Sequence, residues 1–175
     1  YLMDGTFDTS FTMMVPTTLT TGFRNLVCDG SDFYATANGS TLYKIDMDKQ
    51  EITDEISISE IGRHIAYVPE LDGGRGGFEV GDWQTSIYTS LHGAKLGNGP
   101  TLKGAAGSAY YNGVLYTFEQ GWDKRYELCA YDFASGKLLW HTSLADYAAI
   151  KPTENASAGG MSVIRTAEGY QLLTL

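Results

Sequence analysis

The sequence predicts an all-β fold built from about four repeated units, each containing about four short antiparallel strands. Aromatic residues, which favour strands, make up 13% of the 175 residues, and 12 of the aromatic residues are tyrosines. Many of the 21 glycines fall between short alternating apolar runs, in pairs such as Asp29-Gly30 and Asn112-Gly113 that favour hairpin turns. A similar arrangement of strands and turns also recurs along the chain.

Each repeated unit begins near a glycine, at Gly22, Gly62, Gly107 and Gly160. The strands expected in the first unit are residues 24–28, 33–36, 42–46 and 51–56. Those of the second are 64–68, 77–81 and 86–89, followed by a turn at His92-Gly93. Those of the third are 108–111, 114–118, 128–132 and 137–140, and the fourth has only 160–164 and 170–173. The units therefore cover about 22–60, 61–103, 104–146 and 159–175, with 1–14 as an additional piece.

The spacing of the leading glycines favours one architecture. It is 40, 45 and 53 residues, and periods of about 40 to 50 residues with four strands are typical of β-propeller blades. We therefore predict a single β-propeller domain, or part of one, with about four blades. Residues 1–5 and 7–13 are expected to be outer strands, which either pair with the fourth unit or are completed from outside this sequence. A β-sandwich is the alternative, because it would show similar short strands.

Composition and charge exclude several partners. The chain has 12 Lys and Arg against 21 Asp and Glu, and a net charge of −9 repels nucleic acids and anionic membranes. No apolar run approaches the roughly 20 residues of a spanning helix, so we expect no membrane insertion. Cys28 and Cys129 form no CxxC pair and lie in apolar runs, which predicts buried free thiols, with a disulfide as the alternative.

The candidate functional residues lie where strands begin and end. In a propeller, the first strand of a blade starts on the face where the second strand ends, so distant residues meet there. The predicted ligand-binding face comprises Arg24, Arg63, His64, Asp82, Trp83, Glu119 and Trp122, with Asn25, Ser108 and Gln120 nearby in the same arrangement. A Trp ring offers an apolar face to a sugar or a peptide side chain, and an Arg with a carboxylate orients the ligand. The alternative is that Arg63 and Asp82 form a local ion pair and that both tryptophans are packing residues.

No complete catalytic set or metal motif is present. His64 is expected to be a hydrogen-bonding residue of the channel, because no nucleophile motif lies beside it. His92 and His141 have no metal-ligand spacing. Asp46-Met47-Asp48 resembles the start of a calcium loop but lacks the glycine and the distal Glu of that motif, and is expected to be a solvated turn. The glycine-rich residues 72–77 are followed by no Lys-Ser/Thr pair, which predicts a flexible connection. We predict neither a metal nor a cofactor.

Two resemblances add to these predictions. Residues 130–140, Ala-Tyr-Asp-Phe-Ala-Ser-Gly-Lys-Leu-Leu-Trp, resemble the blade repeat of quinoprotein (PQQ-type) propellers. Residues 24–46, 63–67 and 77–83 are similar to propeller regions of secreted Bacteroidetes surface proteins that accompany cleaved-adhesin or choice-of-anchor modules. Those regions usually read Gly-Phe-Trp-Val-Gly-Asn-Trp, whereas Glu79 and Asp82 stand here in place of the Trp and the Asn, which is expected to make one face more acidic.

The second resemblance implies a secreted or cell-surface location and no established activity. We therefore expect a non-catalytic binding or scaffold domain of a larger bacterial protein, with a protein or glycan ligand and neighbouring domains in the same chain. The alternative is a propeller enzyme, either a quinoprotein-like oxidoreductase or a lyase.

Overall fold

The computed structural model describes residues 6–13, 15–16, 19, 22–120, 126–143 and 160–174. These residues form three four-stranded antiparallel sheets and one two-stranded sheet, which confirms the all-β prediction. The strands of the first sheet are β1 (Asn25–Cys28), β2 (Phe33–Thr36), β3 (Gly39–Asp46) and β4 (Glu51–Gly62). Those of the second are β5 (His64–Val68), β6 (Gly77–Gly81), β7 (Ser86–Ser90) and β8 (Lys95–Asn98). Those of the third are β9 (Ala105–Tyr111), β10 (Val114–Glu119), β11 (Glu127–Asp132) and β12 (Leu138–Ser143). The hairpin is β13 (Met161–Thr166) with β14 (Gly169–Thr174).

Each sheet is a meander in which strands adjacent in sequence pair with one another. The tight turn between β9 and β10 shows how the sequence sets this pattern. Asn112 and Gly113 both have positive φ, at 48° and 80°, as the two central residues of a type I′ hairpin require. Beyond the turn, Tyr111 pairs with Val114 and the register continues along both strands.

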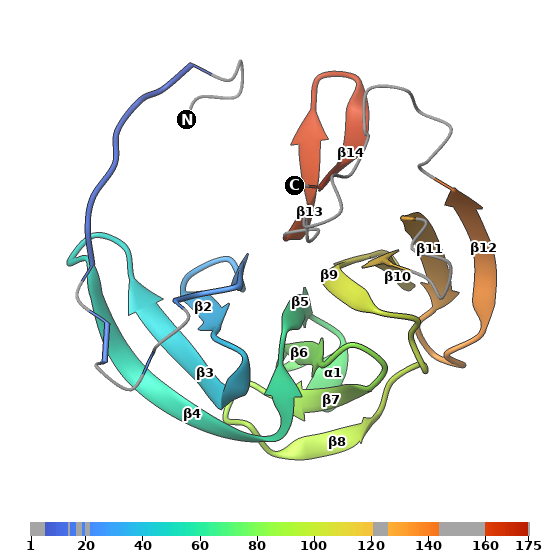
Figure 1. Ribbon diagram of the computed structural model, residues 1–175, viewed down its shortest axis with the longest axis horizontal. Coiled ribbons are helices and arrows are strands. Elements are labelled where there is room, and N and C mark those ends of the chain that lie inside the picture. The colour runs from blue at the N-terminus through green and yellow to red at the C-terminus, as the bar shows by residue number, and fades with distance from the viewer. Residues whose placement is uncertain are drawn as a thin grey trace.

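The sheets are arranged around a common axis as the blades of a β-propeller (Figure 1). The first strands β1, β5, β9 and β13 lie innermost, and β1 contacts β5, β5 contacts β9, and β9 contacts β13. The side chain of Asn25 links three of the blades, because its Nδ2 donates hydrogen bonds to the carbonyl oxygens of Arg63, at 2.7 Å, and Ala106, at 3.2 Å. The predicted β-propeller architecture is therefore confirmed.

The hydrophobic core lies between adjacent blades. Tyr34, Leu42 and Phe78 belong to the cluster between the first and second blades. A second cluster between the second and third blades includes Leu102 and Leu115. Because both faces of a central blade are covered, every residue of β6 is buried. A polar side chain in such a strand needs partners inside the protein.

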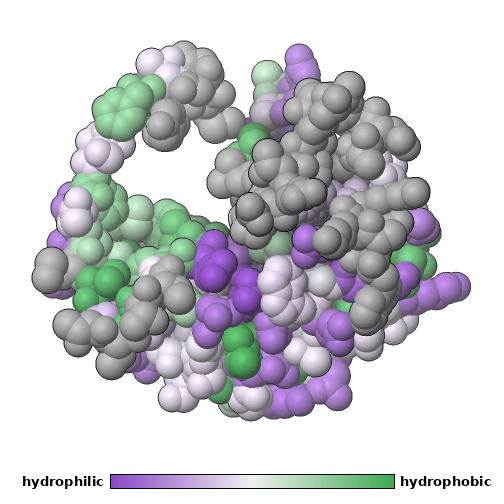
Figure 2. Space-filling view, viewed as in Figure 1, coloured by the Kyte–Doolittle hydropathy of each residue, from purple (hydrophilic) through white to green (hydrophobic). Residues whose placement is uncertain are grey.

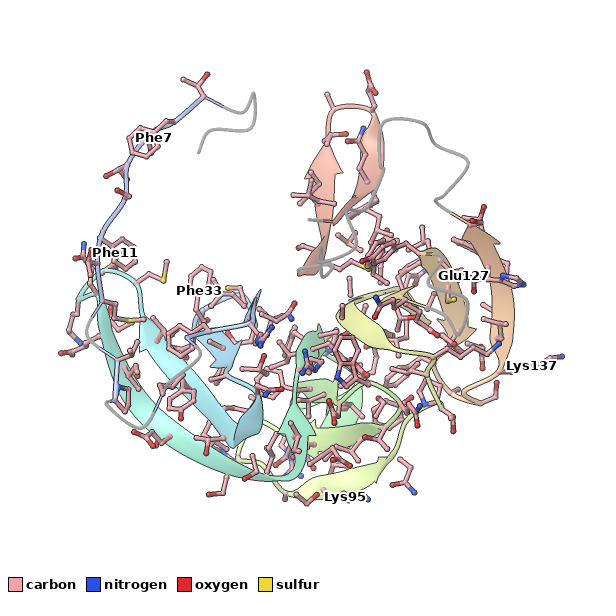
Figure 3. The ribbon with its side chains drawn as sticks, in the orientation of Figure 1. Phe7, Phe11, Phe33, Lys95, Glu127 and Lys137 are labelled. Carbon is pink, nitrogen blue, oxygen red and sulfur yellow. The ribbon has the colours of Figure 1, made fainter. Side chains whose placement is uncertain are left out.

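Two sequence-based expectations are wrong. Residues 7–13 form no strand, and Phe7 and Phe11 are 59% and 41% exposed. Figures 1 and 3 show the reason, since this segment runs along the side of the ring, away from β14, where no sheet edge receives it. Cys28 is free but exposed, because it ends β1 beside the turn at Asp29-Gly30, whereas Cys129 is free and buried as expected.

Helical structure is minor in the described part of the chain. The glycine-rich connection contains α1 (Leu71–Gly74), in which Asp72 and Gly73 have left-handed φ values of 52° and 69°. This segment is therefore closer to a turn than to a regular helix. The helical turn considered at residues 146–150 lies outside the described residues. No helix in the described ranges has the length and apolar character needed to cross a membrane.

Candidate functional site

A pocket of about 470 Å³ opens between the loops of the second and third blades. It lies where β6 and β10 end, on the side where β5 and β9 begin, as the sequence analysis expected for a candidate site. The lining residues come from the β6–β7 loop, the β8–β9 loop and the end of β10: Asp82, Trp83, Gln84, Thr85, Lys103, Gly104 and Gln120.

Backbone hydrogen bonds between the two blades hold the walls of this pocket in place. The carbonyl oxygen of Trp83 accepts from the N–H groups of Gly104, at 2.8 Å, and Ala105, at 2.9 Å. The carbonyl of Gln84 accepts from Leu102, and that of Gly104 accepts from Gln120. Because each loop is bonded to the other, the pocket is preformed, and a ligand need not order it on binding.

Arg63 packs on the indole of Trp83. Its Cζ lies 4.0 Å from the ring centroid, within the range of a cation–π interaction. Its Nε donates a hydrogen bond of 3.3 Å to Oδ1 of Asp82, so the local ion pair considered from the sequence is present. Trp83 is among the residues that line the pocket, and Arg63 is not.

His64 and Glu79 form a fully buried group beneath the Asp82–Trp83 loop. The Nε2 of His64 donates to the carbonyl oxygen of Asp82 at 3.1 Å, and its Nδ1 lies 3.2 Å from Oγ of Ser108 and 3.4 Å from Oε2 of Glu79. Glu79 also accepts hydrogen bonds from the hydroxyls of Ser86 and Ser108. Since acceptors face both ring nitrogens, the arrangement suits a doubly protonated imidazolium beside a carboxylate.

The pKa values of the two groups agree with this assignment. Burial alone would lower the pKa of His64, but the charge and hydrogen bonding of Glu79 outweigh it, and the net shift is upward. Burial alone would raise the pKa of Glu79, but His64 and the two serine hydroxyls outweigh it, and the net shift is downward. Both partners are therefore held in their charged forms.

A second buried glutamate supports the opposite wall. Glu119 is completely buried at the end of β10, and its Oε2 accepts a 2.7 Å hydrogen bond from the backbone N–H of Lys103. Its Oε1 accepts from the hydroxyls of Thr117 and Tyr131, each at 2.7 Å. Burial, and then the hydrogen bond and charge of Glu119, raise the pKa of Tyr131, which therefore stays protonated as a donor.

The structure brings together only some of the predicted site residues. Asp82, Trp83 and Gln120 line the pocket, and Arg63 lies behind Trp83. His64 and Glu119 are buried supports without exposed surface. Arg24 is exposed and lines a different pocket of about 340 Å³ between β1 and β13. Trp122 lies outside the described residues.

Other functional features were missed or misjudged. Gln84, Thr85 and Lys103 line the pocket but were not predicted, because polar loop residues carry no strand periodicity that would single them out. Glu79 was expected to make a face more acidic, but it is completely buried because neighbouring blades cover both sides of β6. Within the described ranges, no group of three or more His, Cys, Asp and Glu side chains is placed to hold a metal ion.

Hydrophilic side chains gather near the centre of the face shown in Figure 2.

The fold and the pocket define a β-propeller with a preformed site between two blades. No protein-family model and no curated protein sequence matches the chain. Solved structures do match. Myxococcus xanthus glutaminyl cyclase matches with a TM-score of 0.65 and 13% identity, over 86% of this chain and 72% of that one.

Two further structures extend the comparison. RRP9 WD40 repeats match with a TM-score of 0.52 and 12% identity, over 82% of this chain and 42% of that one. Kuenenia stuttgartiensis hydrazine synthase matches with a TM-score of 0.50 and 12% identity, over 86% of this chain and 42% of that one. At these identities the likeness concerns the fold alone, and the fold is that of a propeller.

Proposed function

We propose that this chain is a non-catalytic binding domain of a larger secreted or cell-surface protein, and that a protein or glycan ligand binds in the pocket between the second and third blades. The observation that carries this proposal is Trp83, an indole that lines a pocket whose walls are bonded to each other. Buried aromatic anchors in preformed pockets contribute most of the free energy of binding at many interfaces. The similarity of residues 77–83 to secreted propeller regions supports the location.

The chemistry of the pocket favours binding over catalysis. The similar structures include both enzymes and WD40 repeats, so the fold is compatible with either. Three ionisable groups near the pocket, on His64, Glu79 and Glu119, are completely buried and hydrogen-bonded within the protein. A general acid or base must reach the substrate directly or through one water, and these three groups face the protein interior. Of the two ionisable residues that do line the pocket, Asp82 is paired with Arg63 and Lys103 is a cation suited to binding.

Arrays of glycans and peptides, probed with the purified chain, test this proposal. We expect at least one class to bind, and Trp83→Ala to weaken that binding by about 2 kcal/mol or more, roughly 30-fold. Trp140→Ala is the matched control, because it removes an indole that is 45% exposed on the outer strand β12. Binding that is equally strong in the Trp83→Ala variant, or turnover of a bound compound, contradicts the proposal.

A further inference from the structure

Lys103 is an exposed cation in the pocket. The ion pairs between described residues do not include it. Of the two carboxylates nearby, Asp82 accepts from Arg63 at Oδ1, and both oxygens of Glu119 accept hydrogen bonds in the interior. In a chain with a net charge of −9, a pocket lined by an exposed lysine is suited to an anionic group of the ligand.

Trp83 supplies the second element of recognition. Arg63 covers one side of the indole and Trp83 also lines the pocket, so the indole can present an apolar surface to a ligand there. The C–H face of a pyranose ring is flat and apolar, while its edge carries hydroxyls. The remaining lining side chains, Gln84, Thr85 and Gln120, offer amides and a hydroxyl, which donate to and accept from such hydroxyls.

The pocket backbone favours a saccharide over an extended peptide. The N–H groups of Lys103, Gly104 and Gln120 are already bonded to Glu119, Trp83 and Gly104. A peptide that adds to a sheet is held mainly by free main-chain groups, and these three positions have no N–H left to offer it. Recognition at these positions therefore depends on side chains. The volume of about 470 Å³ falls within the range of small-ligand pockets.

We infer that the ligand is an acidic saccharide, with a pyranose ring against Trp83 and its carboxylate on the ammonium of Lys103. This inference rests on the proposed function and narrows it to one class of ligand. The ring contact provides most of the binding. The carboxylate provides discrimination, because an ion pair between carboxylate and ammonium is stronger than the hydrogen bond that the ammonium would donate to an uncharged hydroxymethyl group.

The test uses matched pairs of oligosaccharides that differ only at C6, a uronic acid against its neutral hexose, in the gluco, galacto and manno series. Calorimetric titration of the whole chain is expected to show about tenfold tighter binding of the uronic acid in at least one series. The Lys103→Gln variant is expected to bind the acid no better than the neutral sugar, because its amide can donate a hydrogen bond to either group but carries no charge. Trp83→Ala is expected to weaken both, and Trp140→Ala neither. The preference should also shrink at high salt, because this lysine is exposed.

The outcomes separate this inference from the function on which it rests. Equal binding of acid and neutral sugar, or a preference for the acid that persists in Lys103→Gln, overturns the inference. Binding of peptides but of no saccharide also overturns it, while the proposed binding function stands. If neither peptides nor saccharides bind, the proposed function itself fails.

Discussion

Nδ1 of His64 and Oε2 of Glu79 lie 3.4 Å apart, and neither side chain is exposed to solvent. This pair joins the inner strands of the second blade to Ser108 of the third blade, and His64 also bonds to the carbonyl of Asp82 at the pocket. The position of the pocket loop therefore depends on a charge pair in the interior.

The contribution of this pair to the free energy of unfolding should depend on pH. The pKa of His64 is raised above 6.5, so its contribution is complete below that pH and is lost as the pH rises through the folded-state value. The pKa of Glu79 is lowered below 4.5, so its contribution is complete above that pH and is lost as the pH falls through the folded-state value. The comparison is between the wild type and a His64→Leu/Glu79→Met variant, which lacks both charges. We expect the unfolding free energy of the wild type to exceed that of the variant by the largest amount between pH 4.5 and 6.5. Urea titrations from pH 4 to 9 measure it, and a difference that does not vary with pH contradicts the assignment.

Removing both partners should cost less than the sum of the costs of removing each one. Glu79→Met alone leaves the imidazolium of His64 buried without its counter-charge, and we expect a loss of about 3 to 5 kcal/mol. The double variant His64→Leu/Glu79→Met should lose less than the sum of the two single variants, since apolar side chains of similar size leave no buried charge. Chemical denaturation of all four proteins completes the cycle. Additive losses would show that the two side chains act independently.

The sequence predicted the blades well because local signals define them. Turns at Asp29-Gly30 and Asn112-Gly113 and the alternating aromatic runs place most strands to within about two residues, the usual uncertainty of element boundaries. The N-terminal segment shows the limit of such signals. Phe7, Thr9 and Phe11 alternate with Asp8 and Ser10 as in a strand, but a strand forms only where another strand offers its edge.

The candidate site was only partly predictable for a different reason. Strand ends placed Asp82 and Trp83 on one face, and in the structure both line the pocket between the second and third blades. Burial of Glu79 and Glu119 could not be predicted, since the pattern within one strand does not reveal that neighbouring blades cover both sides. Lys103 enters the pocket through a loop contact between two blades, which depends on tertiary structure alone.

The hydroxyl of Tyr131 should be important for stability. Tyr131→Phe leaves buried Glu119 with one donor fewer on Oε1, since only Thr117 still donates to that oxygen, and we expect a loss of about 1 to 3 kcal/mol, the scale of one hydrogen bond to a carboxylate. Tyr116→Phe is the control, because the hydroxyl of Tyr116 forms no hydrogen bond to another described residue. Thermal unfolding followed by circular dichroism measures both variants. Equal melting temperatures for the two would show that Glu119 does not need this donor.

Gly81 should tolerate no side chain. A Cβ at this position would collide with the backbone oxygen of Thr85, at the point where β6 turns into the pocket loop. We expect Gly81→Ala to destabilise the fold by about 3 kcal/mol or more, at the upper end of overpacking effects. Gly39→Ala is the control, since a Cβ there meets nothing within 4 Å, and it should be neutral or stabilise by up to about 1 kcal/mol. Similar unfolding midpoints for both variants would contradict the close approach of these two segments.

The central claim is that ligand binds between the second and third blades, and nuclear magnetic resonance tests its location directly. Titration of the labelled chain with the tightest ligand from the arrays is expected to shift the backbone amide signals of Trp83, Gln84, Lys103 and Gly104 and the indole signal of Trp83. The signals of β12, at Leu139 and Trp140, should remain unchanged. Shifts confined to β12, or to the pocket between β1 and β13 lined by Arg24, would place the binding site elsewhere and contradict the account.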